Sequence, residues 1–367
     1  MKILHAGNMV NLAYITAKLL RKEDLDIDLL IEKNPPKTSD PILLDPEIHN
    51  EYPTWFRFFD KTKTGWKMNL IKIMREKKYD LIHAYVELPM FSYVANRPFI
   101  AHTQGSDLRE LAFSNSIRGR ILRRAYKKAK ATIFYQPDYL PLLPKLKISN
   151  AIFLPPYWES SFYKPNNVSK NEYENKFLIF HPTGLVWRLK GNDMFFKAFA
   201  KYVKTDPEAF LIIVDRSIDS KRTHNLIEKL DISNKVKFIQ GPLNSSELLH
   251  YYNLADVVAD QFIIGSLGSI GWEVFSCEKP LIAYIKEDYY KKLYGESPPL
   301  VNAKNENEIF DSLQYLKDRK IRTNLGQSAR KWITKYHSAK TYSKKLMDIY
   351  NHIYNKEPLD EYFINYD

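Results

Sequence analysis

The sequence predicts an α/β protein made of two Rossmann-like, doubly wound parallel-sheet domains. Three observations lead to this fold class. The chain has 367 residues, and domains commonly contain about 100–200 residues, so this length suits two of them. Short apolar runs alternate with stretches in which apolar residues recur at helical spacing, a pattern typical of parallel sheets. The alternation breaks once, at a polar stretch near the middle of the chain, and then starts again.

The first half opens with a strand, a turn and a helix. Residues 2–6 form a short apolar run, Gly7 and Asn8 interrupt it, and apolar residues then recur at helical spacing over 12–19. Gly7 and Asn8 are therefore expected in a loop that follows the first strand. Later apolar runs predict strands at residues 27–31, 81–85, 99–102, 131–135 and 151–154.

The second half repeats this alternation. Residues 163–176 are polar, which suits a linker better than a core, so we expect domains at 1–165 and 166–337. A helix within 338–367 is expected to pack back on the first domain. Two such domains would face one another across a cleft at the carboxyl ends of both sheets, where these folds bind ligands. Strands are expected at residues 177–181, 210–214, 236–239, 257–259 and 280–285.

The composition indicates a globular protein with an anionic partner. Hydrophobic residues make up 44% and charged residues 27% of the chain, values typical of folded domains. No window approaches the ~20 apolar residues that span a bilayer. The N-terminus lacks the apolar run of a signal peptide, and Cys277 has no second cysteine to pair with, so a cytoplasmic location is expected. The net charge of +12 predicts attraction to nucleotide, nucleic acid or an acidic membrane face, without choosing among them.

A glycine-rich stretch at residues 265–271 is the strongest local motif. Three of the chain's 12 glycines fall here, just before a helical pattern. Glycines let the backbone approach an anion closely, and the free amides at a helix start favour negative charge. The spacing G-x-x-G-x-x-G matches neither the dinucleotide fingerprint nor a Walker loop. A tight turn that packs a helix on a sheet explains the pattern equally well.

Charged residues lie near this stretch and near the start of the second domain. Glu273 falls on the first turn of the helix after the glycines, where its carboxylate could reach the two hydroxyls of a ribose, although a solvated glutamate is equally common there. Arg188 and Lys190 follow the strand at 177–181. Cations at that edge would neutralise a diphosphate, although Arg-x-Lys is more often ordinary surface charge.

A second motif, His102-Thr-Gln104-Gly-Ser-Asp107, ends a predicted strand of the first domain. Strand alternation places His102 and Gln104 on the same face. A histidine there could bind or orient a sugar or phosphate, although a structural histidine is more frequent.

Taken together, these motifs resemble the retaining GT-B glycosyltransferases usually grouped as family 4. The resemblance covers nearly the whole chain, and the order of the motifs is more specific than any one of them. In chain order the motifs are Gly7-Asn8, His102 to Asp107, Lys190-Gly191-Asn192-Asp193, Ala255-Asp256-Val257-Val258, and the stretch from Gly268 through Glu273 to Pro280.

The resemblance implies transfer of a sugar from a UDP- or GDP-sugar donor to a lipid-linked or other glycan acceptor, with retention of configuration. It implies an oxocarbenium-like transition state and no metal or other cofactor. Lys190 and the nearby Arg188 would hold the donor diphosphate, and Glu273 the ribose. The donor's phosphates and sugar would lie on the backbone of Gly265, Ser266, Leu267, Gly268 and Ser269. The catalytic residues would be His102, Gln104 and Asp107.

Three positions depart from the family's pattern. Gly265 stands where the family has the first glutamate of its Glu-x7-Glu region, and Gln104 stands where it has a histidine. The family's arginine directly follows a glycine, whereas here Leu185 follows Gly184 and Arg188 comes later. A transferase that binds donor without turnover, a sugar-nucleotide epimerase on the same fold, and a nucleic-acid-binding or nucleic-acid-modifying protein remain open as alternatives.

Two basic amphipathic segments, residues 65–78 and 116–130, lie in the first domain. Each could rest on an anionic membrane surface, at the inner face of the membrane, and bring the enzyme to a lipid-linked acceptor. A core-packed helix with a solvated outer face is the competing interpretation. No nucleic-acid recognition motif is visible, so a nucleic-acid partner is not expected.

Overall fold

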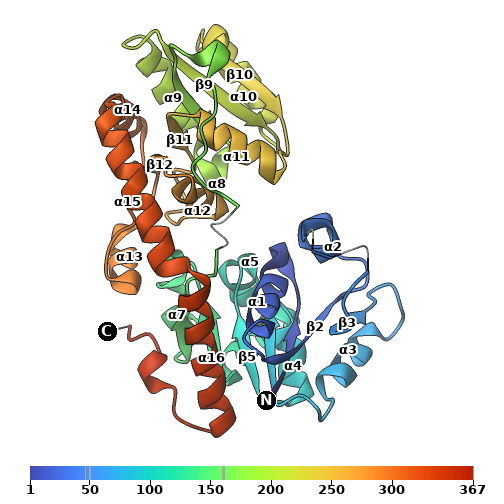
Figure 1. Ribbon diagram of the computed structural model, residues 1–367. Coiled ribbons are helices and arrows are strands. Elements are labelled where there is room, and N and C mark those ends of the chain that lie inside the picture. The colour runs from blue at the N-terminus through green and yellow to red at the C-terminus, as the bar shows by residue number, and fades with distance from the viewer. Residues whose placement is uncertain (46, 49–50, 159–161, 367) are drawn as a thin grey trace. The chain divides into compact units, whose positions relative to one another are not determined.

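The computed structural model describes residues 1–45, 47–48, 51–158 and 162–366. The chain forms two compact units (Figure 1). The first unit comprises Met1–Tyr157 and Ala339–Asp367, and the second comprises Trp158–Ser338. The division falls after Tyr157, somewhat before the boundary at 165 that the sequence suggests, and the C-terminal segment belongs to the first unit.

The first unit is built on a seven-stranded sheet of order β3-β2-β1-β4-β5-β6-β7, in which every pairing is parallel. The order reverses between β1 and β4, the arrangement of a doubly wound sheet. The strands are β1 Lys2–Ala6, β2 Asp26–Glu32, β3 Phe56–Phe59, β4 Leu81–Tyr85, β5 Phe99–His102, β6 Ala131–Phe134 and β7 Ala151–Phe153.

Helices cover both faces of this sheet. On one face, α1 and α16 bury Ala17, Leu20 and Leu346 against strand residues such as Ile3 and Ile100. On the other, α4 packs between α3 and α6, where right-handed crossovers place them. The helices of the unit are α1 Leu12–Arg21, α2 Pro41–Leu44, α3 Trp66–Met74, α4 Pro89–Ala95, α5 Ser106–Arg109, α6 Ile117–Lys128, α7 Leu142–Lys145 and α16 Ala339–Asn355.

The second unit is built on a six-stranded parallel sheet of order β10-β9-β8-β11-β12-β13, whose order reverses between β8 and β11. Both parallel sheets that the sequence predicts are thereby confirmed. The strands are β8 Phe177–His181, β9 Ala209–Asp215, β10 Val236–Gln240, β11 Val257–Ala259, β12 Leu281–Ala283 and β13 Val301–Asn302.

The core of the second unit forms where α9 and α14 pack together against the sheet. Phe195 and Phe199 of α9 and Leu313 of α14 are fully buried there with Ile179 and Leu211 of the strands. On the other side of the unit, α12 packs on α15. The helices are α8 Trp187–Lys190, α9 Asn192–Val203, α10 Ser220–Lys229, α11 Ser245–Leu254, α12 Ser269–Ser276, α13 Glu287–Tyr294, α14 Glu306–Tyr315 and α15 Arg319–His337.

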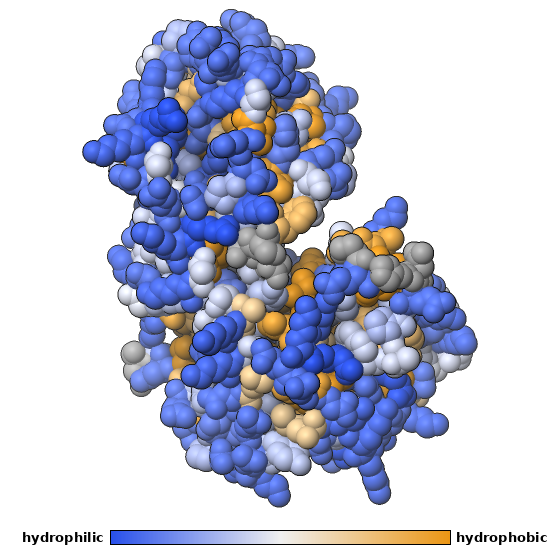
Figure 2. Space-filling view, in the orientation of Figure 1, coloured by the Kyte–Doolittle hydropathy of each residue, from blue (hydrophilic) through white to orange (hydrophobic). Residues whose placement is uncertain are grey.

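Hydrophilic side chains cover most of the visible surface of each unit (Figure 2). An apolar patch lies over α2, where Leu43 and Leu44 are exposed. Within the described part of the chain, no helix is both long and apolar enough to cross a membrane.

Candidate functional site

The carboxyl ends of β8 and β11 mark the point where the strand order of the second sheet reverses. Doubly wound sheets bind ligands at this kind of point, because the loops from the two strands diverge to opposite faces there. The connection after β8 carries Arg188 and Lys190 on the short helix α8, and the loop after β11 carries the glycine-rich stretch. The topology therefore brings the two donor motifs of the sequence to one edge of one sheet.

These two loops are in direct contact. The amide of Phe262 donates to the carbonyl of Lys190 at 2.8 Å, and the Thr183 hydroxyl donates to Asp260. Gly191 has φ +69°, and a Cβ there would stand only 3.3 Å from Cβ of Phe262. Glycine at 191 thus lets the backbone that carries Lys190 approach the loop after β11 closely.

Side-chain hydrogen bonds fix the shape of the glycine-rich loop. Nε2 of the Gln261 side chain donates to the Ser266 carbonyl at 3.0 Å, and its Oε1 accepts from the Ile264 backbone amide at 2.8 Å. The Leu267 amide donates to the Tyr290 hydroxyl at 2.7 Å. The loop is therefore organised before any ligand arrives, which reduces the entropy lost on binding.

The loop leads into α12, whose N-terminus is open to an anion. Gly268 is the N-cap residue and has no side chain to cap the helix. The amides of Ser269 and Ile270 are the first two of α12 and have no carbonyl partner within the helix. With the helix dipole, they favour a negative charge at this end.

Gly265 adopts φ +83°, a conformation that favours glycine, and lies against the stem of Lys286. A Cβ at 265 would stand 2.9 Å from Cγ of Lys286. The Lys286 amide also donates to the Gly265 carbonyl at 3.0 Å. Gly265 stands where the resembled family has a glutamate, and the side chain of Lys286 lies directly beside it. Lys286 follows β12 and is not among the site residues predicted from the sequence.

Glu273 lies inside the second unit, on α12, and is only 7% exposed. Its Oε2 accepts from the Tyr252 hydroxyl at 2.5 Å. Oε1 has no hydrogen-bond partner among the residues that the structure describes. Burial raises the pKa of the Glu273 carboxyl to about 7; Asp260 acts in the same direction, and the hydrogen bond from Tyr252 opposes it. The Tyr252 hydroxyl therefore fixes one oxygen of the carboxyl, and no side chain or amide among the described residues binds the other.

Three cations surround the carboxyl edge of this sheet. Lys190 is half-buried, and Arg188 and Arg216 are exposed. The Arg216 guanidinium, directly after β9, donates to the Pro182 carbonyl at 3.2 Å. Burial, together with the charges of Lys190 and Arg216, lowers the pKa of His181 to about 4 against the opposing effect of a hydrogen bond to the Ala259 carbonyl, so both cations act on the end of β8. Arg216 is not among the site residues predicted from the sequence, where its only signal is a basic residue directly after a buried strand.

In the first unit, His102 and Gln104 are buried at the end of β5 with unused polar atoms. His102 is 0% exposed and Gln104 is 7% exposed. Among the described residues, Nε2 of His102 and both side-chain amide atoms of Gln104 have no hydrogen-bond partner. Buried polar atoms without partners cost free energy, so such atoms suit a site that a polar ligand completes.

Asp107 is turned toward its own loop. Its carboxylate accepts from the amides of Gln104 at 3.1 Å and Gly105 at 2.6 Å, and from the Tyr126 hydroxyl at 2.9 Å. Burial raises the pKa of Asp107, while these donors act against that rise. Asp107 therefore stabilises the loop that carries Gln104.

Gly7 and Asn8 lie where the first sheet reverses its strand order, after β1. Gly7 has φ +100°, and a Cβ there would come within 3.3 Å of Cβ of Tyr85. The Asn8 side chain donates to the Ser39 carbonyl at 2.8 Å and accepts from the Tyr14 amide at 2.9 Å. Asn8 therefore anchors its own loop, and Gly7 allows the close approach to β4.

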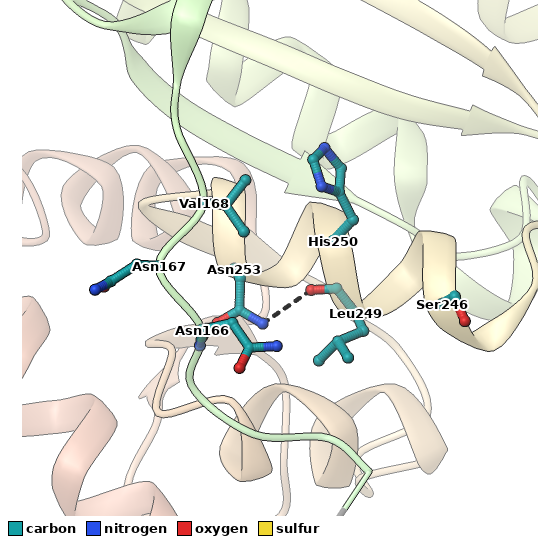
Figure 3. A pocket seen from close by; sticks show the side chains of 7 residues that line it. All are labelled: Asn166, Asn167, Val168, Ser246, Leu249, His250 and Asn253. Carbon is teal, nitrogen blue, oxygen red and sulfur yellow. Dashed lines mark hydrogen bonds between the residues drawn. The ribbon is translucent and has the colours of Figure 1, made fainter.

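An open pocket lies elsewhere on the second unit, between the segment at residues 166–168 and α11 (Figure 3). Asn253 of α11 holds that segment, because its Oδ1 accepts from the Asn166 amide at 2.8 Å, while its Nδ2 donates within the helix to the Leu249 carbonyl at 2.9 Å. None of the donor residues predicted from the sequence lines this pocket.

Comparison with known proteins identifies the fold. Residues 164–332 match the model of the family described as "Glycosyl transferases group 1". No curated protein sequence matches the chain. Solved structures resemble it along its length at low identity. HepE of Anabaena, in complex with UDP, aligns with a TM-score of 0.74 and 16% identity, covering 96% of this chain and 100% of its own.

Two further structures give the same result. Sucrose-phosphate synthase from Thermosynechococcus elongatus has a TM-score of 0.70 and 14% identity, covering 97% of this chain and 100% of its own. A glycosyltransferase from Rickettsia africae has a TM-score of 0.69 and 16% identity, covering 97% and 99%. The chain thus has the GT-B fold of two Rossmann-like domains, and its residues 164–332 match the model of the glycosyl transferases group 1 family.

Proposed function

We propose that this protein transfers a sugar from a nucleoside diphosphate sugar to a glycan or lipid-linked acceptor, with retention of anomeric configuration. The contact between the Lys190 carbonyl and the Phe262 amide, at 2.8 Å, carries the proposal. It joins the cation-bearing loop after β8 to the glycine-rich loop after β11. The resulting surface combines amide hydrogens, a helix N-terminus and positive side chains, the groups that bind a diphosphate. HepE, which shares the fold, has been crystallised with UDP and with UDP-glucose.

In this proposal the second unit stabilises the departing diphosphate. Lys190 and Arg188 supply positive charge, and the amides of Ser269 and Ile270 donate to the phosphate oxygens at the start of α12. The free Oε1 of Glu273 accepts from the ribose hydroxyls. Negative charge grows on the diphosphate as the glycosidic bond breaks, so donors fixed beforehand lower the barrier. These groups provide the charge compensation, and we expect no metal or other cofactor to be required.

The first unit supplies groups for the sugar. His102 and Gln104 offer unused polar atoms at the end of β5, and sugar hydroxyls both donate and accept hydrogen bonds. Asp107 acts as a positioning residue because its carboxylate holds the backbone of Gln104. The glycine at 265 and the glutamine at 104 affect the choice of donor sugar rather than the binding of its diphosphate.

Calorimetry with a panel of nucleoside diphosphates tests this proposal. We expect UDP or GDP to bind the full chain and the matching monophosphate to bind at least tenfold more weakly, because hydrogen bonds to charged groups contribute about 1.5–3 kcal/mol each. Turnover is measured as release of that diphosphate from its sugar conjugates in the presence of lipid-linked and soluble glycan acceptors. The absence of binding by every nucleoside diphosphate would refute the donor site.

We propose further that the basic outer face of α3 and α6 rests on an anionic membrane, near a lipid-linked acceptor. These helices flank α4 in one layer of the first unit. Exposed apolar side chains project among the charges, with Met68 66% and Ile117 76% exposed. The exposed cations of this basic face are Lys67, Lys72, Arg75, Arg118, Arg120, Arg124, Lys127 and Lys128.

Changing both Arg120 and Arg124 to glutamine is expected to weaken binding to vesicles that contain phosphatidylserine. Each cation near an anionic surface contributes about 1 kcal/mol, so the double variant should bind roughly 30-fold more weakly at low salt. Sedimentation with phosphatidylserine and with neutral phosphatidylcholine vesicles provides the measurement. A Lys22→Gln variant serves as control, because Lys22 follows α1 in the opposite helical layer. Equal binding to neutral vesicles would count against a membrane role for the basic face.

A further inference from the structure

A row of buried histidines and tyrosines runs beneath the carboxyl edge of the first sheet. His5 of β1, His83 and Tyr85 of β4, and His102 of β5 occupy alternate strand positions, so their side chains point to the face that α1 and α16 cover. Each is 0% exposed, as is Tyr350 of α16. Three imidazoles in one apolar layer need an explanation, because burying polar groups is costly unless they are bonded.

Hydrogen bonds join these five side chains into a single chain that ends at His102. The Tyr85 hydroxyl lies 3.1 Å from His5 Nδ1. The Tyr350 hydroxyl lies 3.0 Å from His5 Nε2 and 2.5 Å from His83 Nδ1. His83 Nε2 lies 3.0 Å from His102 Nδ1. Each ring nitrogen of His5 and His83 thus has a partner in this chain, and His5 also interacts with the Ala13 backbone, whereas His102 Nε2 has no partner among the described residues.

All three imidazoles are neutral at physiological pH. Burial lowers the pKa of His5 and of His102 to about 3 and that of His83 well below its usual value. A neutral imidazole has one donor nitrogen and one acceptor nitrogen. Within each ring, the role of one nitrogen therefore fixes the role of the other. A tyrosine hydroxyl can accept from both of its neighbours or donate to one and accept from the other, so Tyr350 decides the arrangement.

The distances around Tyr350 select one direction. A separation of 2.5 Å from His83 Nδ1 fits an O–H donor and is too short for an ordinary N–H donor, whereas 3.0 Å from His5 Nε2 suits an N–H donor. Tyr350 therefore donates to His83 and accepts from His5. His83 must then donate through Nε2 to His102 Nδ1, which leaves the proton of His102 on Nε2.

We infer that Tyr350 and His83 are positioning residues, which lock His102 in the Nε2–H tautomer so that it donates a hydrogen bond to an acceptor oxygen of the bound sugar. The lock extends from α16, at the end of the chain, through β4 to the end of β5. It makes Nε2 of His102 a hydrogen-bond donor before any ligand binds. Only the identity of the ligand rests on the proposed function; the tautomer follows from the side chains alone.

Imidazole 15N NMR on histidine-labelled protein measures this tautomer directly. The His102 signals are assigned by their loss in His102→Gln. In the wild-type protein we expect a protonated Nε2 and an unprotonated Nδ1 for His102. In Tyr350→Phe the hydroxyl that sets the direction is gone, so the His102 shifts should move toward a mixture of both tautomers. In an active enzyme, kcat/KM should also fall by roughly twofold to tenfold, the worth of one neutral hydrogen bond.

Tyr342→Phe is the matched control. Tyr342 lies on the same helix, is 1% exposed, and loses one buried hydroxyl that contacts Thr16 at 3.0 Å and none of the three histidines. This variant should be destabilised about as much as Tyr350→Phe yet keep the wild-type His102 spectrum. A wild-type His102 protonated on Nδ1 overturns the inference even if Tyr350→Phe does not fold. So does a His102 spectrum that Tyr350→Phe leaves unchanged.

The two proposals fail separately. If no sugar transfer occurs but the His102 tautomer responds to Tyr350→Phe, the proposed function is wrong and the lock remains. If transfer occurs and the tautomer does not respond, the lock is wrong and the proposed function remains.

Discussion

Lys190→Ala is expected to lower kcat/KM for the nucleotide-sugar donor by about 100- to 1000-fold, the usual cost of removing one preorganised donor that stabilises developing negative charge. Lys190 lies in the connection after β8. Its backbone carbonyl accepts from the Phe262 amide in the loop after β11. Its half-buried ammonium makes no ion pair within the described residues. The substitution removes the charge and keeps the backbone contact, so folding stability should hardly change.

Three measurements separate this interpretation from a general loss of structure. The melting temperature of Lys190→Ala should match the wild type. Affinity for the diphosphate should fall while affinity for the bare nucleoside is unchanged. Lys204→Ala is the control, since Lys204 follows α9 at the opposite edge of the sheet and should retain full turnover. Normal diphosphate affinity in Lys190→Ala would mean that the ligand binds elsewhere.

The fold followed from the sequence because fully buried parallel strands give short apolar runs separated by helical patterns. Two strands were missed. β3 covers only Phe56–Phe59 at one edge of its sheet, and β13 covers only Val301–Asn302 at the edge of the other. Edge strands are buried on fewer sides, so their apolar runs are shorter and less distinct.

The boundary between the two units differs for a physical reason. The polar stretch at residues 163–176 suggested a linker, yet it begins within the second unit. Tyr163 is 7% exposed, lies near the Tyr252 ring, and its carbonyl accepts from the Arg330 guanidinium at 3.0 Å. Polar composition marked a segment that runs over the surface of the second unit, and such segments resemble linkers in sequence.

Within the site, residues in local motifs could be identified and residues brought there by folding could not. The glycine-rich loop and Lys190 stand out because glycine and charge are visible in a few residues of sequence. Arg216 binds the Pro182 carbonyl, Lys286 packs against Gly265, and Tyr252 binds Glu273. Each comes from a different part of the chain, so no local motif marks it. His5 and His83 lie within mostly apolar strands, and nothing in the sequence marks them as members of a hydrogen-bonded chain.

The second large effect concerns Glu273→Gln, which we expect to stabilise the unliganded protein at pH 8 while it weakens nucleotide binding. Burial raises the pKa of Glu273 to about 7 in the folded state, against an ordinary value of 4.5. The proton is therefore held more tightly when the protein is folded. This contribution to stability is fully present below pH 4.5 and is lost as the pH rises through 7. The shift corresponds to on the order of 3 kcal/mol.

Glutamine keeps an acceptor for the Tyr252 hydroxyl and carries no charge. Glu273→Gln should therefore not lose folding stability as the pH rises through 7. Urea unfolding at pH 5 and pH 8 checks the stability change: the wild type should lose stability between them relative to the variant. Exposed Glu174, changed to glutamine, should show no such difference.

Nucleotide affinity of Glu273→Gln should fall by roughly 10- to 100-fold at pH 8, because the ribose hydroxyls lose a charged acceptor. A variant that gains no stability at pH 8 would show that the carboxylate is well solvated, and one that binds normally would exclude Glu273 as the ribose ligand. Stability gained together with affinity lost is the result expected of a buried carboxylate retained for its ligand.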